Sequence, residues 1–215
     1  MAELLTIHSE FPEPERIARA AELIRKGELI AIPTDTIYGL AADPMNRSGM
    51  ESIFAVKKRS PDAAVSLLVN SFDRARKCAA KMPPLFDELA GKFWPGPVTI
   101  VVRASPDILD LVTGGTGFVG LRFPKTAIAN ALMDVLGGPV TATSANRSGQ
   151  PHSTTAEQVS DALGQKIPLI VDGGPSPSEE ASTVVRLDGD QWEMLREGSV
   201  REVDFKEFER YRRKT

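Results

Sequence analysis

Hydrophobic and polar positions alternate between a helical and a strand-like period along the chain. Segment 12–27 places its apolar residues on one face of a helix, namely Ile17, Ala20, Ala21 and Ile24. Gly27 suits the C-terminal cap of this helix. The same period predicts helices over residues 48–61, 72–82, 84–96, 126–138 and 154–165. Ser48 and Glu51 have the spacing of a capping box at the start of the second helix.

Short apolar runs of strand length lie between these helices. They predict strands at residues 28–34, 64–69, 97–102, 139–146 and 168–174. Residues 182–198 are predicted to form a hairpin around Asp188-Gly189, and the tail from Val203 to Thr215 a helix. This alternation predicts one α/β domain built on a mixed sheet.

Composition narrows the class of protein. The chain has 215 residues, 41% of them hydrophobic, which is enough for a packed core. Its formal net charge of -3 argues against a protein whose main role is to bind a nucleic-acid backbone, although a local basic pocket is compatible with it. The sequence has neither a signal peptide nor an apolar stretch of roughly 20 residues, so we expect a cytoplasmic protein without membrane contact.

The few cysteine and histidine residues suggest no metal cage or nucleophile. Cys78 is the only cysteine, and His8 and His152 lie far apart, so zinc-ligand spacing is absent. We expect all three to be structural or surface residues. The glycines of "GGTGFVG" have dinucleotide-fingerprint spacing but lead into a strand rather than a helix, so they predict a loop. Segment 173–182, "GGPSPSEEAS", is expected to be a mobile loop and a candidate lid.

Several polar residues stand at the ends of predicted apolar elements. In "KKRSP", Lys57 and Arg59 either complement the dipole of a helix end or form a cationic site for phosphate. In "TSAN", Ser144 and Asn146 follow a strand, where α/β proteins tend to bind ligands. Arg122 lies on an apolar strand and therefore needs a partner, either a structural ion pair or the carboxylate of a small molecule.

Seven motifs occur in one order: "AIPTDTIYGLAAD", "KKRSP", "WPGPVT", "GLRFP", "TSAN", "DGG" and "AST" with "LREG". As an ordered set they resemble the YrdC-like family of threonylcarbamoyl-AMP synthases. The resemblance covers residues 15–200 and implies a twisted mixed sheet flanked by helices around a deep basic cavity. It describes residues 1–215 as a single domain of the short form, with a core over about 15–200 and a C-terminal helical tail over 201–215.

The resemblance implies a reaction in which L-threonine, bicarbonate and ATP give threonylcarbamoyl-adenylate and pyrophosphate. The product would pass to a tRNA threonylcarbamoyl-transferase complex, with weak or no direct tRNA binding. Mg²⁺ would be held through the ATP phosphates and not by a protein metal site. Alternatives are a paralogue of the same fold without synthase activity, a relative of the hydrogenase-maturation proteins that handle carbamoyl-adenylate, and an RNA-binding module.

The resemblance also assigns roles to individual residues. Lys57 and Arg59 match a K-x-R motif and would act in catalysis and in binding the ATP phosphates. Further ATP ligands would be Ser144, Asn146, Thr154 and Arg196. Threonine would be held by Thr34, Arg122 and Ser182. Asp35 and Thr36 would organise the turn at the opening motif, and Tyr38 would form part of the cavity wall.

Overall fold

Ten strands form one continuous mixed sheet in residues 1–213, the part of the chain that the computed structural model describes. The strands are β1 (Glu3–Thr6), β2 (Ile30–Ile32), β3 (Gly39–Ala41), β4 (Ser66–Leu68), β5 (Val98–Arg103), β6 (Phe118–Arg122), β7 (Val140–Ser144), β8 (Leu169–Asp172), β9 (Thr183–Asp188) and β10 (Gln191–Arg196). The helices are α1 (Pro14–Arg25), α2 (Arg47–Lys57), α3 (Phe72–Cys78), α4 (Leu85–Phe93), α5 (Asp110–Thr113), α6 (Ala127–Leu136) and α7 (Ala156–Leu163), followed by a 3-10 helix (Glu202–Tyr211).

The strand order is β1-β8-β2-β3-β7-β4-β6-β5-β9-β10. Parallel pairs (β1 with β8, β8 with β2, β4 with β6, β5 with β9) are mixed with antiparallel ones. The antiparallel pairs β3 with β7 and β7 with β4 join the two halves at the centre. This arrangement confirms the mixed α/β sheet flanked by helices that the sequence predicts.

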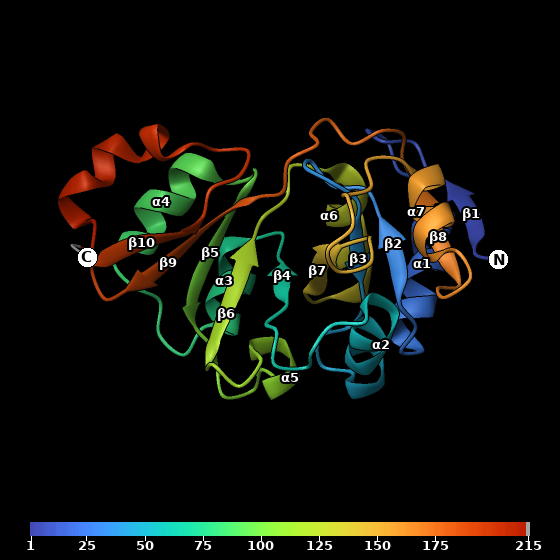
Figure 1. The fold of residues 1–215 in the computed structure, drawn as a ribbon, viewed down its shortest axis with the longest axis horizontal. Coiled ribbons are helices and arrows are strands. Elements are labelled where there is room, and N and C mark those ends of the chain that lie inside the picture. Colours follow the sequence, from blue (N-terminus) through green and yellow to red (C-terminus); the bar gives the residue numbers. More distant parts are fainter. Residues whose placement is uncertain (214–215) are drawn as a thin grey trace.

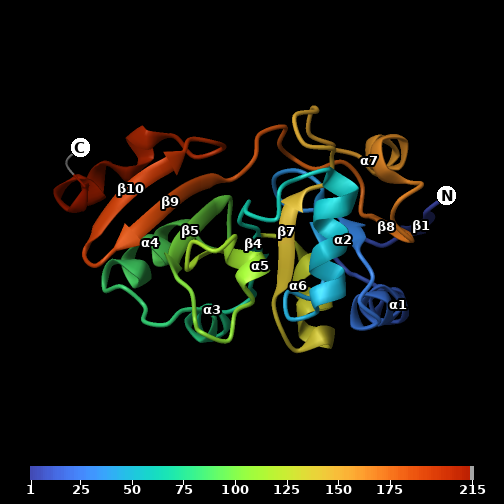
Figure 2. The same ribbon diagram turned by 60° about the horizontal axis from the view of Figure 1, so that its bottom comes forward.

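The helices divide between the two halves of the sheet. Figure 1 shows α1, α2, α6 and α7 around the half that begins with β1, and α3, α4 and the C-terminal 3-10 helix around the half that ends with β10. Figure 2 shows the same division from below. Helices α1 and α6 bury one apolar cluster against β2 and β8, and the remaining helices pack on a larger one. No helix within residues 1–213 is both long and apolar enough to span a membrane.

Most predicted elements are confirmed, and the exceptions are short. Strand β3 escapes prediction because its three residues are all buried and show no alternation. Strand β1 and helix α5 have only four residues each. The tail is helical as predicted but is a 3-10 helix, which places Phe205 and Phe208 on one side, both buried. Its last two predicted residues, 214–215, lie outside the described part.

The cap of α2 differs from the prediction. Asn46, not Ser48, is the N-cap residue, and its side-chain Oδ1 accepts a hydrogen bond from the Gly49 amide at 3.1 Å. We expect Asn46→Ala to lower the free energy of unfolding by about 1 kcal/mol, because that amide loses its partner. Ser48→Ala is the matched control and should leave stability unchanged in urea denaturation. Equal losses for the two variants would contradict this assignment.

Candidate functional site

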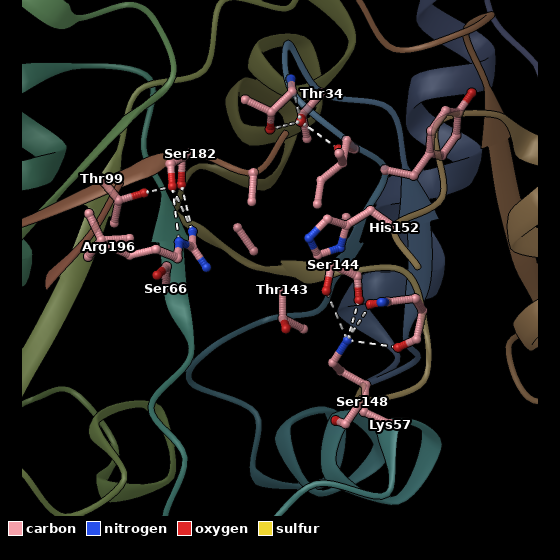
Figure 3. Close-up of a pocket in the computed structure, with 18 of the residues that line it drawn as sticks. Thr34, Lys57, Ser66, Thr99, Thr143, Ser144, Ser148, His152, Ser182 and Arg196 are labelled. Atoms are coloured by element: carbon pink, nitrogen blue, oxygen red, sulfur yellow. Dashed lines mark hydrogen bonds between the residues drawn. The ribbon is translucent and has the colours of Figure 1, made fainter. Parts of the chain in front are cut away.

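A cavity of about 510 Å³ lies where the two halves of the sheet meet. It is lined by residues of β3 to β7, β9 and β10 and by the segments beside them. Eight of the nine site residues predicted from the sequence line it, namely Thr34, Lys57, Arg59, Arg122, Ser144, Asn146, Ser182 and Arg196. Figure 3 shows Lys57 and Ser144 on one side of the space and Ser182 and Arg196 on another.

The end of α2 delivers two cations to the cavity. Lys57 is the last residue of the helix, and Lys58 after it adopts the left-handed conformation with a φ of 52°. This turn ends the helical course of the chain, so that Arg59 also reaches the cavity although it lies only two residues beyond Lys57. Lys57 and Arg59 therefore do more than complement the dipole at the end of α2, because both also line the cavity.

The ammonium group of Lys57 is buried against the segment after β7. It donates hydrogen bonds to the carbonyl oxygens of Ser144 and Asn146, the latter at 2.8 Å. The side-chain oxygens of the same two residues lie at 3.3 Å and 3.2 Å. Burial, helped by the charge of Arg59, lowers the pKa of Lys57 to about 8. Lys57 therefore fixes the TSAN segment relative to α2.

Asn146 shapes the segment that follows. Its side-chain Nδ2 donates to the carbonyl oxygens of Gln150 at 2.5 Å and Pro151 at 3.1 Å. Arg59 donates to the Ala64 carbonyl at 3.1 Å, and burial lowers the pKa of its guanidinium. These bonds hold the cavity wall in place while leaving several guanidinium N–H groups of Arg59 for a ligand.

Arg122 joins the strand end of β6 to the turn at residues 34–36. Its guanidinium pairs with Asp35, donates to the Thr36 hydroxyl at 2.9 Å and to the Gly96 carbonyl at 3.2 Å. The structural ion pair is thus present, and the same guanidinium lines the cavity. Thr34 donates its hydroxyl to the Ile37 carbonyl at 2.6 Å and accepts from the Thr36 amide. Asp35 and Thr36 therefore organise the turn.

Ser182 and Arg196 meet at the start of β9 and the end of β10. The Arg196 Nη2 donates to the Ser182 carbonyl at 2.7 Å, and the Ser182 hydroxyl lies 2.8 Å from that of Thr99. Burial, with the charges of Arg122 and Arg59, lowers the pKa of Arg196. The hairpin around Asp188-Gly189 is what brings these two residues together.

Thr154 is the ninth predicted site residue, and the structure does not bring it to the cavity wall. Its amide and hydroxyl both bond the Gln158 side chain, at 2.7 Å and 3.2 Å. Its carbonyl accepts from the Ser176 amide at 2.8 Å, which ties it to segment 173–182. Tyr38 lines the cavity and also holds this segment, because its hydroxyl donates to the Gly174 carbonyl at 2.7 Å. Closure of the segment as a lid stays a prediction.

Several lining residues were not predicted from the sequence: Ser66, Thr99, Thr143, Ser148 and His152. Ser66 opens the apolar strand β4 and Thr99 interrupts the apolar run of β5, which is the signal that could have found them. His152 is exposed, in agreement with the expected structural or surface position, but it also borders the cavity, which the sequence does not indicate (Figure 3).

Positive charge dominates the cavity. Among the lining residues that the structure describes, four are cationic (Lys57, Arg59, Arg122 and Arg196) and none is a carboxylate. Within residues 1–213, no group of three or more His, Cys, Asp or Glu side chains could hold a metal ion. Fixed cations beside serine and threonine hydroxyls suit a ligand with several anionic groups, such as a nucleoside polyphosphate.

Comparison with known proteins points to one protein family. Residues 22–198 match the model of the Sua5/YciO/YrdC family, described as telomere recombination. The threonylcarbamoyl-AMP synthase of Pyrococcus abyssi is 37% identical over 81% of this chain and 52% of its own length. The threonylcarbamoyl-AMP synthase of Bacillus subtilis is 36% identical over 86% of this chain and 54% of its own length. The chain thus spans about half the length of these two relatives.

A solved structure of Pyrococcus abyssi Sua5 complexed with L-threonine superimposes with a TM-score of 0.93. It is 33% identical in sequence and is matched over 98% of this chain and 62% of that one. The similarity therefore extends over nearly all of the fold described above, including the strands that line the cavity.

Proposed function

The chain belongs to the Sua5/YciO/YrdC family, and from this premise we propose that it is an L-threonylcarbamoyladenylate synthase. It joins L-threonine, bicarbonate and ATP to form threonylcarbamoyl-AMP and pyrophosphate, as a nucleotidyltransferase. The observation that carries the proposal is the meeting of Lys57, Arg59 and Arg196 with Thr34, Arg122 and Ser182 in one cavity. The L-threonine found in the similar Sua5 structure supports the choice of amino acid.

The two sets of residues have different roles in this proposal. Lys57, Arg59 and Arg196 bind the phosphates of ATP, together with polar groups of Ser144 and Asn146. Their charges are fixed by hydrogen bonds to the protein before substrate arrives, so little reorganisation is needed in the transition state. Thr154 lies outside the cavity wall and is hydrogen-bonded to segment 173–182. It can therefore bind ATP only if Thr154 and this segment move together toward the cavity.

Thr34, Arg122 and Ser182 hold L-threonine. Three N–H groups of Arg122 are used by the protein, and a guanidinium has five, so two are left for the carboxylate of threonine. The hydroxyls of Ser182 and Thr34 line the same cavity. Recognition is therefore expected to depend on hydrogen bonds more than on net charge, because Asp35 neutralises Arg122.

The reaction has two bond-forming steps. The amine of threonine attacks bicarbonate-derived carbon, a C–N bond forms, water leaves, and an N-carboxylate results. An oxygen of this carboxylate then attacks the α-phosphate, and the bond to pyrophosphate breaks. Negative charge develops on phosphate oxygens, and the fixed cations stabilise it.

Mg²⁺ fits this site as a companion of the triphosphate. The lining offers hydroxyl and amide oxygens, whereas its charged groups are cations, so we propose that Mg²⁺ is held mainly by phosphate oxygens. When bound, it neutralises phosphate charge.

The product serves a tRNA threonylcarbamoyl-transferase complex, and the protein itself contacts tRNA weakly or not at all. We further propose that residues 15–200 form one domain and that residues 201–215 are its tail. We also propose that the protein acts in the cytoplasm.

The test is pyrophosphate release from ATP and Mg²⁺, with L-threonine and bicarbonate each present or omitted. We expect release only when both are present, because the N-carboxylate is the nucleophile. Arg59→Ala should abolish most of it. Release that is indifferent to threonine, or none at all, would overturn the synthase proposal and favour a paralogue with the same fold.

A further inference from the structure

His152 lies on the wall between two hollows of the molecule. It lines the cavity of about 510 Å³ and also an adjoining hollow of about 800 Å³, which α2, α7 and the segment after β7 surround. In Figure 3 its imidazole extends into the space bordered by Thr34 on one side, Ser144 on another and Arg196 on a third. The ring therefore lies between Thr34, which is proposed to hold threonine, and Ser144 and Arg196, which are proposed to hold the phosphates.

The proposed reaction needs a proton acceptor at this place. L-threonine carries an ammonium group at neutral pH, and only the free amine can attack carbon. The arginines that line the cavity do not give up or accept protons near neutrality. Lys57 donates to oxygens of Ser144 and Asn146, and the Tyr38 hydroxyl donates to the Gly174 carbonyl. Among the lining residues that the structure describes, the imidazole of His152 is the side chain suited to take the proton.

We propose that His152 is a catalytic residue that accepts the proton of the threonine ammonium. This proposal rests on the proposed function. The ammonium N–H bond breaks, its electron pair stays on nitrogen, and the free amine forms the C–N bond with bicarbonate as water leaves. The imidazolium then returns the proton to the departing pyrophosphate, so that the ring is restored and the charges balance.

The charges around His152 fit a base whose strength depends on substrate. Cations line the same cavity from α2 (Lys57), the segment after it (Arg59), β6 (Arg122) and β10 (Arg196), along with the Tyr38 phenol. The adjoining hollow adds Lys58, Arg147 and Asp161. Desolvation, then Arg196 and Lys57, lower the pKa of His152, which favours the neutral ring that a base requires. A bound triphosphate offsets these cations and raises the pKa again when the proton must be taken up.

The first experiment compares His152→Gln with His8→Gln, the same change at an exposed histidine outside the cavity. Glutamine keeps hydrogen bonding but cannot take the proton. We expect pyrophosphate release by His152→Gln to fall about 100-fold or more in kcat, with the KM for ATP little changed. The acidic limb of the pH profile should disappear, and added imidazole should partly restore His152→Ala. His8→Gln should behave as wild type.

The second experiment does not depend on turnover. The chain has two histidines, so His8→Gln assigns the ring signals in an NMR titration. Adding ATP with Mg²⁺ should raise the titration midpoint of His152 and leave that of His8 in place. The proposal is overturned by a wild-type rate and pH profile in His152→Gln, or by an unchanged ring titration once calorimetry shows that ATP is bound. A wild type that binds ATP and shifts the ring, but releases no pyrophosphate with threonine, would refute the synthase function instead.

Discussion

Replacing Lys57 by methionine is expected to lower pyrophosphate release by about 10²- to 10³-fold, the usual cost of losing one fixed group that stabilises transition-state charge. Methionine keeps the length of the side chain but not the charge. Loss of the ammonium group also leaves the carbonyl oxygens of Ser144 and Asn146 without their donor, so the segment proposed to bind ATP becomes less well held. The measurement is the steady-state rate with saturating threonine and bicarbonate, which separates kcat from the KM for ATP.

Lys58→Met is the matched control for this prediction. Lys58 is the next residue, carries the same charge and is exposed. Its backbone is in the left-handed conformation, which methionine at this position would also have to adopt. We expect Lys58→Met to keep most of the activity, because Lys58 does not line the cavity. Equal losses in the two variants would mean that general positive charge near α2 is sufficient, and a fully active Lys57→Met would remove Lys57 from the catalytic machinery.

Local patterns account for what the sequence predicted well. Helix α1 was recognised because Ile17, Ala20, Ala21 and Ile24 repeat with the helical period, and the structure buries all four. The hairpin followed from Asp188-Gly189, since Gly189 adopts a φ of 64° at its tip. Strand β3 could not be found in this way, because its three residues are all buried and show no alternation, and one of its two partners, β7, lies far along the chain.

The site shows the same division between local and distant information. Ser144 and Asn146 stand just after a strand, a place readable from the sequence, and the structure brings both to the cavity. The hydrogen-bond partners of Lys57 are Ser144 and Asn146, which lie 87 and 89 residues away in the sequence. These bonds therefore depend on how the fold places α2 beside the end of β7. His152 carries no local signal at all, and only the fold reveals that it faces the cavity.

Arg122 illustrates a question that the sequence leaves open and the structure answers only in part. An arginine on an apolar strand needs a partner, and Asp35 is that partner. Yet the guanidinium also lines the cavity, with two N–H groups unused by the bonds described above. The ion pair and the proposed grip on threonine are thus compatible, since the pair orients the group that the substrate would meet.

Asp35→Ala is therefore expected to impair both stability and threonine use. The side chains of Asp35 and Arg122 are only 10% and 7% exposed, so the variant would leave a buried guanidinium without its counter-ion. Removing one partner of such a pair costs about 3–5 kcal/mol in the free energy of unfolding. The KM for threonine should rise more than the KM for ATP, because Arg122 loses its orientation. Urea denaturation and substrate-variation kinetics measure the two effects.

Two further variants decide whether burial of the Asp35–Arg122 pair is the cause of the stability loss in Asp35→Ala. Glu193→Ala breaks the Arg186–Glu193 pair, whose side chains are 30% and 36% exposed, and a longer contact with the exposed Arg213, and should cost only about 0–1 kcal/mol. The double variant Asp35→Ala, Arg122→Met removes both buried charges and should regain much of the stability lost in Asp35→Ala, while threonine use stays impaired. If the double variant is no more stable than Asp35→Ala, the loss comes from the turn at residues 34–36 and not from an unpaired charge.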